Sequence, residues 1–473
     1  MTLPTRSPTA ATAFAGTAMR ITLRLLLIAS VAVGSACARL EPRPDLARLY
    51  AGTRSNPEQP PIIVIHGLMG STLVDRDSGE QVWPGSLGTL AFSDYRGLAQ
   101  LEEAERSGHG LVPGELFYGI GAVDFYAGLL GTLEKIGGYQ RSQPGTPVVD
   151  KAARRYYVLL YDWRRDNVEA VHALHELIDQ IRVDYGNPEQ RVDIIAHSNG
   201  GLISNYYLRY GPTDVLDRDR PAQWHEASSR VRRVVLLGTP NLGSVVSLKR
   251  LFSGFRIALR TVPVEVLTTF STPFETLPHP LLKSIVDASG KPLDIDIYDP
   301  QTWRSRHWSV YSTEVIERVR KAAATPAAGE AAVRRMQAMF ERNLRRAERF
   351  QWALTPPLQD PAIDIAVFGG DCELTSARAL LETDADGDHL VFRRRQLHTA
   401  EGESDFDRLL LEPGDGLVTR ASQVGRATMT DGQEKPSLNF FPIAQTLFLC
   451  ELHGQLTVNP YFQNNLLYFL FAS

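Results

Sequence analysis

The sequence is short of cysteine, of unbalanced charge and of long apolar runs. Three cysteines in 473 residues cannot form the framework of a disulfide scaffold. The 50 basic and 54 acidic side chains leave a formal net charge of -4, which excludes the positive footprint of a nucleic-acid-binding protein. We find no repeat at solenoid or propeller spacing and no apolar run long enough to span a bilayer.

What the chain does have is the composition of a large globular protein. Its residues are 43% apolar and 22% charged. Its length is several times that of a usual domain of about 100 to 150 residues. We therefore expect one large fold with insertions, or two folds.

The N-terminal residues differ from the rest. Arg20 and Arg24 precede a short apolar run at residues 25–33, and small residues lead from there to Cys37. This order is typical of an export signal, and the small residues before the cysteine resemble the lipidation site of bacterial lipoproteins. We therefore expect residues 1–36 to be a signal segment that is cleaved before Cys37.

Lipidation of Cys37 would make the protein an exported bacterial lipoprotein of the periplasm or outer membrane. Two or more acyl chains would hold it stably on a membrane, and residues 37–60, which include several prolines, would form a tether. An ordinary secretory signal, which would give a secreted protein, and an uncleaved amphipathic start are the alternatives.

The other two cysteines, Cys372 and Cys450, form an even pair. In an oxidising compartment they are free to form one disulfide. The alternative is two buried free thiols.

Strands and helices alternate along the rest of the chain. Asp166 precedes a helical segment whose apolar residues recur at steps of three and four up to residue 181, and residues 199–210 and 464–471 also suit helices. Short apolar runs rich in β-branched residues predict five buried strands at residues 62–65, 156–161, 192–195, 231–237 and 363–368. The alternation predicts an α/β fold for residues 61–473, with a mostly parallel sheet and helices on both faces.

Two regions interrupt this alternation, at about residues 75–150 and 245–360, and we interpret both as cap insertions. The second contains a predicted helix at residues 330–352 with an apolar face and many arginines. Such a helix could lie on anionic lipid, or it could be a solvated cap helix with salt bridges.

The strongest chemical signal is a turn at Ser198. A buried strand leads through Ala196 and His197 to this serine, and Asn199 and Gly200 then open a helix. A serine hydroxyl is a poor nucleophile unless a tight turn presents it to a base. The pattern predicts a nucleophile at Ser198; a glycine-rich turn with a capping serine is the alternative.

A serine nucleophile needs backbone N–H groups that stabilise the oxyanion. The first predicted strand ends in the loop 66–71, which contains two glycines. We expect the N–H groups of Leu68, in this loop, and Asn199, after the nucleophile, to form the oxyanion hole. An ordinary glycine turn is the alternative for this loop.

The base and the acid follow from their order along the chain. On folds with such a serine turn, the acid and then the histidine follow the nucleophile. His453 is the one histidine after the candidate acids, so it is the predicted base. Asp415, on a turn after an apolar run, is the predicted acid, and Asp431 is its rival.

A run of three aspartates, Asp384, Asp386 and Asp388, resembles the start of a calcium loop. The glycine is misplaced for such a loop, and Arg395 stands where the closing glutamate belongs. We interpret the run as a solvated turn, and we predict no metal and no organic cofactor.

With these residues in place, the chain resembles the lecithin:cholesterol acyltransferase family of the α/β-hydrolase superfamily. The resemblance spans residues 61 to about 470. It rests on the turn at Ser198, which we call the elbow, on the loop 66–71, which we call the oxyanion loop, on the Asp415 turn, on His453 to Pro460, and on three further motifs at residues 161–164, 238–244 and 271–274. It departs from the family at His66, where Pro is more usual, and in having no cysteine between Cys37 and Cys372.

The resemblance implies transfer of an acyl chain from a lipid ester, usually a glycerophospholipid, to an alcohol through an acyl-serine. Ser198, Asp415 and His453 would form the triad. The partners would then be a lipid substrate, an alcohol or water, and a membrane surface reached through the lipid anchor and the caps. A phospholipase or lipase that uses water is the first alternative, and a non-catalytic lipid-binding envelope lipoprotein is a more distant one.

Overall fold

The computed structural model describes most of the chain from residue 43 onward. The described ranges are 43–55, 59–86, 88–89, 93–100, 110–120, 123–257, 260–360, 362–385, 387–397, 405–426 and 442–471. The signal segment 1–36, the lipidation residue Cys37, the rival acid Asp431 and Asp386 lie outside the described residues. In the described part, no helix is both long and apolar enough to cross a membrane.

A seven-stranded sheet forms the centre of the fold, in the order β19-β14-β10-β9-β1-β8-β7, and every neighbouring pair is parallel. Its strands are β1 (Ile62–Ile65), β7 (Gln140–Arg141), β8 (Arg155–Leu159), β9 (Val192–His197), β10 (Val231–Leu237), β14 (Asp364–Gly370) and β19 (Ile443–Leu449). The five predicted strands are the five inner ones, so the predicted α/β fold with a parallel sheet is confirmed.

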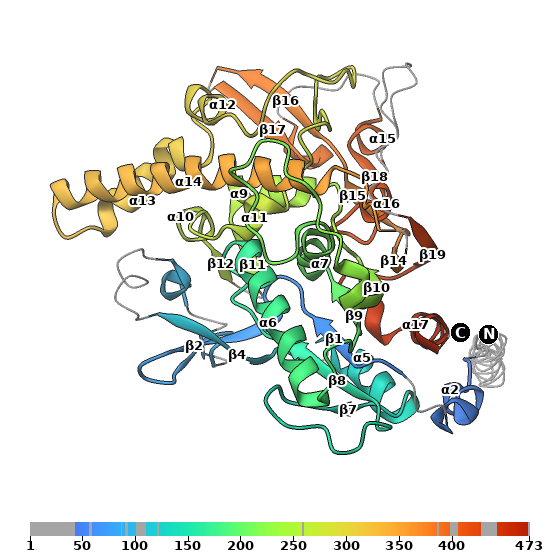
Figure 1. Cartoon of the computed structure of the whole chain (residues 1–473). Helices are drawn as coiled ribbons and strands as arrows, with labels where there is room; N and C mark the ends of the chain where they lie inside the picture. The colour runs from blue at the N-terminus through green and yellow to red at the C-terminus, as the bar shows by residue number, and fades with distance from the viewer. Residues whose placement is uncertain are drawn as a thin grey trace, which may run out of the picture. The chain divides into compact units, whose positions relative to one another are not determined.

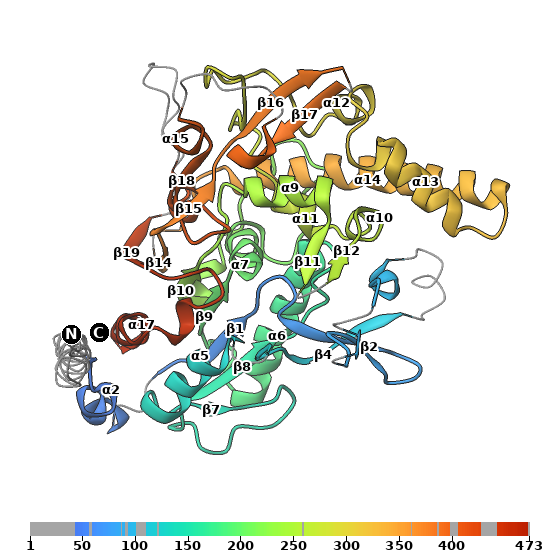
Figure 2. The same ribbon diagram turned by 180° about the vertical axis from the view of Figure 1, so that it is seen from behind.

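The sheet is covered on both faces, which explains why its strands are apolar runs rather than alternating ones. On β1, Ile63 and Ile65 pack in one cluster with α6 (Asn167–Tyr185) and α7 (Asn199–Tyr210). The intervening Ile62 and Val64 pack in another cluster with α5 (Ala127–Gly131) and α17 (Pro460–Phe471). Figure 1 shows α6 in front of the sheet, and Figure 2 shows α5 and α17 from the other side.

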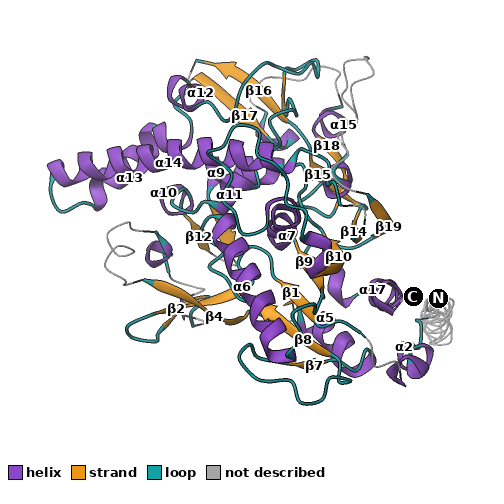
Figure 3. Cartoon of the chain, in the orientation of Figure 1, coloured by secondary structure: helices purple, strands orange, loops and turns teal. Residues whose placement is uncertain are grey.

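Local signals fix the ends of the predicted helices. The Asp166 carboxylate caps α6 by accepting from the Val168 N–H at 2.8 Å, and Gly186, with φ 56°, ends it. The long helix α14 (Pro326–Leu354) starts after Thr325, which accepts from the Ala328 N–H, and covers the predicted 330–352. Figure 3 shows α14 as the long purple helix.

The region from 75 to 150 contains small sheets and short helical elements in its described residues. A three-stranded sheet is formed by β2 (Ser71–Asp75), β3 (Gln81–Trp83) and β4 (Leu111–Leu116), and β5 (Gly119–Ile120) pairs with β6 (Val123–Asp124). The other elements are η2 (Arg96–Leu98), α5 and the π-helical turn η3 (Thr132–Ile136).

The region from 245 to 360 is mainly helical. Its core packs Trp303, Phe274 and Phe340, which are fully buried. Its elements are α9 (Val245–Ser253), β11 (Phe255–Ile257), β12 (Arg260–Val262), α10 (Val264–Leu267), α11 (Thr272–Glu275), β13 (Ile285–Val286), α12 (Pro300–Ser305), η4 (Ser309–Tyr311), α13 (Thr313–Ala322) and α14.

Strands that follow the second insertion in the chain pair with it or with one another. β13 pairs with β16 (Ala379–Asp384), which pairs with β17 (Gly387–Val391), and β15 (Glu373–Ser376) pairs with β18 (Leu411–Gly414). The remaining short elements are α8 (Ala227–Arg230), η5 (Arg394–Gln396), α15 (Phe406–Leu410), α16 (Arg420–Val424) and η6 (Leu456–Val458).

Part of the predicted tether is attached to the domain. Residues 37–60 include α2 (Leu46–Leu49) and η1 (Ala51–Ser55). Leu46 and Tyr50 pack against Leu467, and the Tyr50 hydroxyl donates to the Asn464 carbonyl at 2.7 Å. These contacts bury apolar side chains that a free tether would leave in water, so residues 46–50 do not form a tether.

Candidate active site

Ser198 lies on a sharp turn between β9 and α7. Its backbone has φ 54° and ψ -122°, a conformation that costs a non-glycine residue about 1 to 3 kcal/mol and clusters at functional sites. The turn is tightly enclosed: a Cβ on Gly200 would lie 2.8 Å from the Ile65 carbonyl oxygen, and one on Gly67 would lie 2.7 Å from the Ser198 Cβ. Only glycine fits at both positions. The absence of side chains there lets the oxyanion loop and α7 pass close to the turn that carries Ser198.

The predicted base and acid both reach this serine. His453 Nε2 lies 3.0 Å from Ser198 Oγ, and His453 Nδ1 lies 2.7 Å from Asp415 Oδ2. Asp415 is 1% exposed. The three side chains therefore form one hydrogen-bonded line, although Ser198 and His453 lie 255 positions apart in the chain.

The acid is held by its own turn. Asp415 Oδ1 accepts from the N–H groups of Leu417 at 3.0 Å and Val418 at 2.7 Å, which leaves Oδ2 for His453. Its backbone carbonyl accepts from the His453 N–H at 2.9 Å. Asp415 follows β18, in a two-stranded sheet beside the main one, rather than a strand of the main sheet.

A disulfide joins the strands that lead to this part of the site. Cys372 follows β14, Cys450 follows β19, and the two are bonded with their Cα atoms 4.9 Å apart. Glu451 and His453 come directly after the bridge. The two cysteines are therefore paired, and their bridge ties down the start of the loop that carries His453.

The two predicted oxyanion donors line the same pocket as Ser198. Asn199 is the first residue of α7, where backbone N–H groups have no partner within the helix. Neither the Leu68 nor the Asn199 N–H has a hydrogen-bond acceptor among the described residues. Both are available to an anion, and the α7 dipole favours negative charge at this end.

A second hydrogen-bonded chain joins the oxyanion loop to the histidine loop. The Tyr126 hydroxyl accepts from the Gly67 N–H at 2.9 Å and contacts His197 Nδ1 at 2.9 Å, and His197 Nε2 contacts the His453 carbonyl at 3.3 Å. A carbonyl only accepts, so Nε2 carries the hydrogen and Nδ1 accepts from Tyr126. Burial, and then the nearby His453, lowers the pKa of His197 to about 3, which keeps this imidazole neutral.

The sequence prediction missed this role of Tyr126 and His197. His197 stands next to the nucleophile and could have been singled out as a buried polar residue. Tyr126 comes from the first insertion and carries no local signal.

The side chain of Asn199 is fixed by a buried amide pair that it forms with Asn167. The side chains of Asn199 and Asn167 exchange two hydrogen bonds, of 2.7 and 3.0 Å, and Asn199 Nδ2 also donates to the Tyr161 hydroxyl at 3.2 Å. The Tyr161 hydroxyl in turn donates to the His66 carbonyl at 2.9 Å. This network links the residue after the nucleophile to the start of the oxyanion loop.

Glu275 extends this hydrogen-bond network through Asn167. Both carboxylate oxygens lie 3.2 Å from the Asn167 N–H, and the side chain is buried. Burial, and then the charge of Asp166, raises the pKa of Glu275 well above its ordinary value. Sequence reasoning missed Asn167 and Glu275, because neither stands near the elbow in the chain.

The motif at residues 161–164 connects the sheet to both insertions. Asp162 and Arg164 form a buried ion pair at 2.6 Å, and Arg164 Nη1 donates to the Leu98 carbonyl in the first insertion at 2.8 Å. The Thr272 hydroxyl in the second insertion donates to the Trp163 carbonyl at 2.6 Å. This motif therefore has a structural role, because it bonds to both insertions.

The motif at residues 238–244 supports the acid turn. The Ser244 hydroxyl donates to the Leu417 carbonyl at 2.5 Å, and its backbone N–H donates to the Thr276 carbonyl at 2.8 Å. A Cβ on Gly243 would lie 1.9 Å from the Leu277 carbonyl oxygen, so only glycine fits there.

Ser198 and His453 line a cavity of about 350 Å³. Most of its wall is apolar. The apolar side chains are Met69 of the loop 66–71 and, from the two insertions, Trp83, Phe117, Phe125, Val246, Phe255 and Ile257. Such a lining fits a hydrocarbon chain.

Two arginines, Arg250 and Arg256, interrupt the apolar lining. Arg250, from α9, lines the cavity and lies with its guanidinium carbon 4.3 Å from the centre of the Phe255 ring. Burial lowers the pKa of Arg250 to about 10, so it remains charged at neutral pH. It has no carboxylate partner in the part of the chain that the structure describes. A partly buried guanidinium without a counter-ion favours a ligand that brings an anionic group.

In the suspected calcium run, Asp384 is the last residue of β16 and Asp388 lies in the antiparallel strand β17. Asp384 contacts His389 Nε2 at 2.9 Å, and Asp388 accepts from the Thr383 hydroxyl at 2.5 Å and pairs with Arg306. The described residues contain no cluster of side chains that could hold a metal ion.

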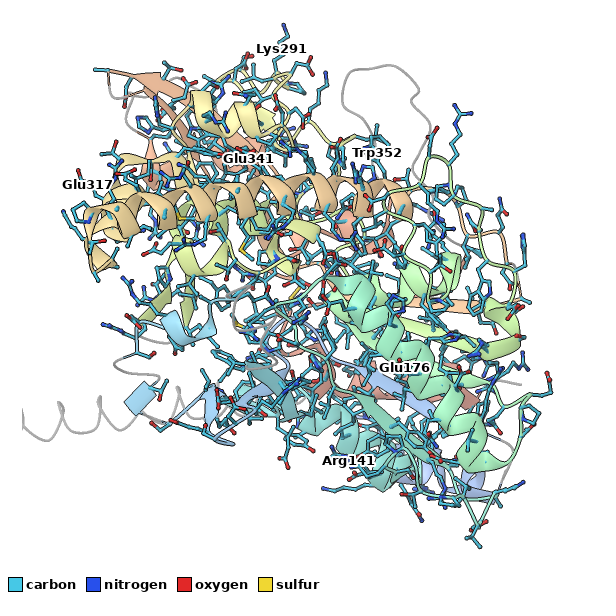
Figure 4. All side chains as sticks on the ribbon, turned by 60° about the vertical axis from the view of Figure 1, so that its left-hand side comes forward. Arg141, Glu176, Lys291, Glu317, Glu341 and Trp352 are labelled. Atoms are coloured by element: carbon cyan, nitrogen blue, oxygen red, sulfur yellow. A yellow bond between two sulfur atoms is a disulfide. The ribbon has the colours of Figure 1, made fainter. Side chains whose placement is uncertain are left out.

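The arginine-rich helix α14 uses several of its cations internally. Arg346 pairs with Asp166 and with Asp214, Arg349 pairs with Asp217, and Arg345 pairs with Glu341. Glu341 is labelled on α14 in Figure 4. These contacts favour the solvated cap helix with salt bridges.

The parallel sheet, its two helical layers and the serine turn define an α/β-hydrolase fold. A solved structure described as the Tle4–Tli4 complex is 15% identical to this chain, covers 87% of it and 98% of its own chain, and superposes with a TM-score of 0.50. That likeness shows the fold alone.

Residues 153–289 match the family model described as lecithin:cholesterol acyltransferase. The resemblance to this family is thereby confirmed over these residues, which include Ser198 and Asn199 but neither Asp415 nor His453. On this fold, the match supports an enzyme of the lipid acyltransferase and lipase-type hydrolase class. None of the curated proteins matches the chain.

Two lipase structures also align with the chain. The Staphylococcus hyicus lipase is 13% identical, with 87% of this chain and 92% of that chain covered and a TM-score of 0.33. Lipase 1 from Pelosinus fermentans is 13% identical, with coverages of 88% and 99% and a TM-score of 0.32.

Proposed function

We propose that the protein is a lipid O-acyltransferase that moves an acyl chain from a phospholipid ester to an alcohol through an acyl-serine. The observation that carries the proposal is the line from Ser198 Oγ through His453 to Asp415 at the end of an apolar cavity. The family match at residues 153–289 supports the choice of lipid as the substrate.

In the first half-reaction, His453 Nε2 takes the proton of Ser198 Oγ as this oxygen bonds to the ester carbonyl carbon. The N–H groups of Leu68 and Asn199 stabilise the oxyanion, and Asp415 stabilises the imidazolium. His453 then gives its proton to the leaving oxygen as the ester C–O bond breaks. The products are acyl-Ser198 and a lysolipid.

In the second half-reaction, an acceptor hydroxyl loses its proton to His453 and attacks the acyl-serine. The new ester leaves, and the proton returns to Ser198. If the acceptor is water, the product is a free fatty acid and the enzyme is a hydrolase.

Arg250 supports a phosphate-bearing donor. It lines the cavity that holds Ser198, as Arg256 does, and it has no carboxylate partner among the described residues. A glycerophospholipid places a phosphodiester a few bonds from its ester carbonyls. The guanidinium would bind that phosphate while the acyl chain fills the apolar part of the cavity.

A phospholipase or lipase is the second candidate. His66 stands where the acyltransferase family more often has proline, and no cysteine lies between Cys37 and Cys372 to close a membrane-binding insertion. Both departures favour hydrolysis.

We also propose that the protein is exported as a lipoprotein that carries its lipid on Cys37. The disulfide between Cys372 and Cys450 supports an oxidising compartment. The intact mass of the mature N-terminal peptide tests this: a diacylglyceryl-modified Cys37 is expected, and an unmodified N-terminus that begins elsewhere would contradict it.

The reaction is tested by supplying vesicles of acyl-labelled phospholipid, with and without a long-chain alcohol, and following the label by mass spectrometry. We expect the label in a new ester when the alcohol is present. Label found only in fatty acid would identify the hydrolase, and label that stays in phospholipid in every arm would refute both candidates.

A further inference from the structure

A second hollow, of about 410 Å³, lies beside the candidate active site. Val246 and Leu417 line both cavities, so the two are neighbours. Four cationic side chains line the second one, Lys249, Arg393, Arg394 and Arg395, and Asp407 is the one carboxylate among its lining residues. We call this cavity the cationic hollow.

The cations of the hollow have no ion-pair partner in the described part of the chain. Elsewhere on the second insertion, which contributes Lys249 to the hollow, arginines have carboxylate partners, as Arg318 has in Glu265 at 2.9 Å. Burial, and then the charges of Arg393 and Arg395, lowers the pKa of Lys249. The four cations therefore repel one another, and an anionic ligand would relieve that repulsion.

Exposed leucines accompany these cations. Leu374 lines the hollow and is 67% exposed. Leu452, next to His453, is 45% exposed, and its Cδ2 lies 3.5 Å from where a Cβ on Gly416, another lining residue, would stand. Cations beside exposed apolar side chains are typical of a surface that contacts a lipid interface. A site for free phosphate has no need of the leucines.

We propose that the cationic hollow binds the phosphate-bearing headgroups of anionic lipids in the surface that supplies the acyl donor. The headgroups neutralise the four cations, and the leucines enter the interface beside the mouth of the active site. This deepens the proposed function, because it states which kind of surface the site works on. It rests on that function only in taking the surface to be the source of substrate.

The test measures binding to vesicles of diether lipids by sedimentation, in the Ser198→Ala protein, so that no turnover occurs. The variant replaces Arg393, Arg394 and Arg395 by glutamine. We expect the parent to bind vesicles containing phosphatidylglycerol more tightly than pure phosphatidylcholine vesicles, with an affinity that falls as salt rises. We expect the variant to bind the anionic vesicles about 100-fold more weakly, with an unchanged melting temperature as evidence that it folds.

A matched control removes the same charge elsewhere, from the exposed Arg334, Arg335 and Arg342 of α14. We expect it to bind anionic vesicles as the parent does. If the control loses binding as strongly as the hollow variant, net charge or α14 is responsible and the proposal is wrong. Equal binding of the parent to both vesicle types also overturns it.

A further arm separates lipid from free phosphate. Inorganic pyrophosphate is titrated into the parent by calorimetry, without vesicles. Tight binding of pyrophosphate that the hollow variant lacks, together with no preference for anionic vesicles, would make the hollow a soluble-anion site and overturn the lipid assignment. Turnover of a soluble short-chain ester by the protein with Ser198 intact reports the proposed function separately, because that assay contains no lipid surface.

Discussion

Two parts of the candidate site differ in whether their polar side chains have partners. We call the triad with Tyr126, His197 and Asn199 the floor, and Arg250 with the four cations of the hollow the rim. At the floor, the side chains of Tyr126, His197 and Asn199 each have defined partners, as Ser198, His453 and Asp415 do. At the rim, Arg250 and the four cations of the hollow have no carboxylate partner in the described residues.

The difference separates the two tasks of a catalyst. Fixed partners hold the reacting groups in place before the substrate arrives, which reduces the reorganisation needed in the transition state. Unpaired cations are costly without a ligand and become favourable when an anion binds. We conclude that the floor is built for chemistry and the rim for recognition.

The largest effect should come from the acid at the floor. Asp415→Asn keeps the size of the side chain but no longer stabilises the imidazolium, so kcat should fall by about 10⁴-fold. Asp431→Asn is the matched control and should keep the parent rate. The reverse result, in steady-state assays on a soluble ester, would make Asp431 the acid.

A smaller effect should come from the hydrogen bonds through Tyr126 and His197 that join the oxyanion loop to the loop of His453. Tyr126→Phe leaves the Gly67 N–H without its acceptor and His197 without its donor, and one unsatisfied buried group costs about 1 to 3 kcal/mol. We expect kcat to fall by about 10- to 100-fold, with little change in KM, because a positioning residue acts through the oxyanion loop.

Tyr139→Phe serves as the control for this variant, because the buried Tyr139 hydroxyl has no hydrogen-bond partner among the described residues. Its kcat should match that of the parent. Equal kcat values for both variants would show that the Tyr126 chain does not position the site.

The rim should show a change in specificity instead. Arg250→Gln removes a charged donor, and hydrogen bonds to charged groups contribute about 1.5 to 3 kcal/mol. We expect kcat/KM for a phospholipid to fall about 10-fold relative to that for an uncharged diacylglycerol, and Arg250→Lys to recover part of the loss. An equal loss on both substrates would remove the phosphate-binding role.

The smallest effect concerns the pH dependence of stability. A buried carboxyl with a raised pKa binds a proton more tightly in the folded state than in the unfolded one. Its contribution is therefore full below the ordinary pKa of 4.5 and is lost as the pH rises through the raised value. Glu275→Gln should keep stability nearly constant across that range.

Melting curves of the parent and of Glu275→Gln at acid and neutral pH check this. The two should be similar at acid pH, with the variant more stable at neutral pH. A variant that is less stable at neutral pH would mean that the carboxylate, rather than the acid, is the form that the Asn167 N–H requires.

The sequence predicted what depends on local pattern. Apolar runs located the inner strands, and the strand, serine and glycines located the elbow at Ser198, because tight backbone approaches demand small residues. The order of acid and histidine along the chain was enough to choose His453, and the turn after an apolar run favoured Asp415 over Asp431. The structure brings Asp415 and His453 together.

Residues whose roles depend on distant packing could not be predicted. Tyr126 and Arg250 reach the site from the two insertions, where nothing local distinguishes them from other cap residues. The edge strand β19 was missed because its residues are only partly buried, in an alternating pattern, and β7 because it has two residues.

The measurement that tests the central claim most directly is covalent labelling of the folded protein with a fluorophosphonate, followed by peptide mass spectrometry. An activated serine at the floor should give a single adduct on Ser198, and labelling should be lost in His453→Ala although that variant keeps the hydroxyl. No adduct on Ser198, or equal labelling in both proteins, would contradict the account.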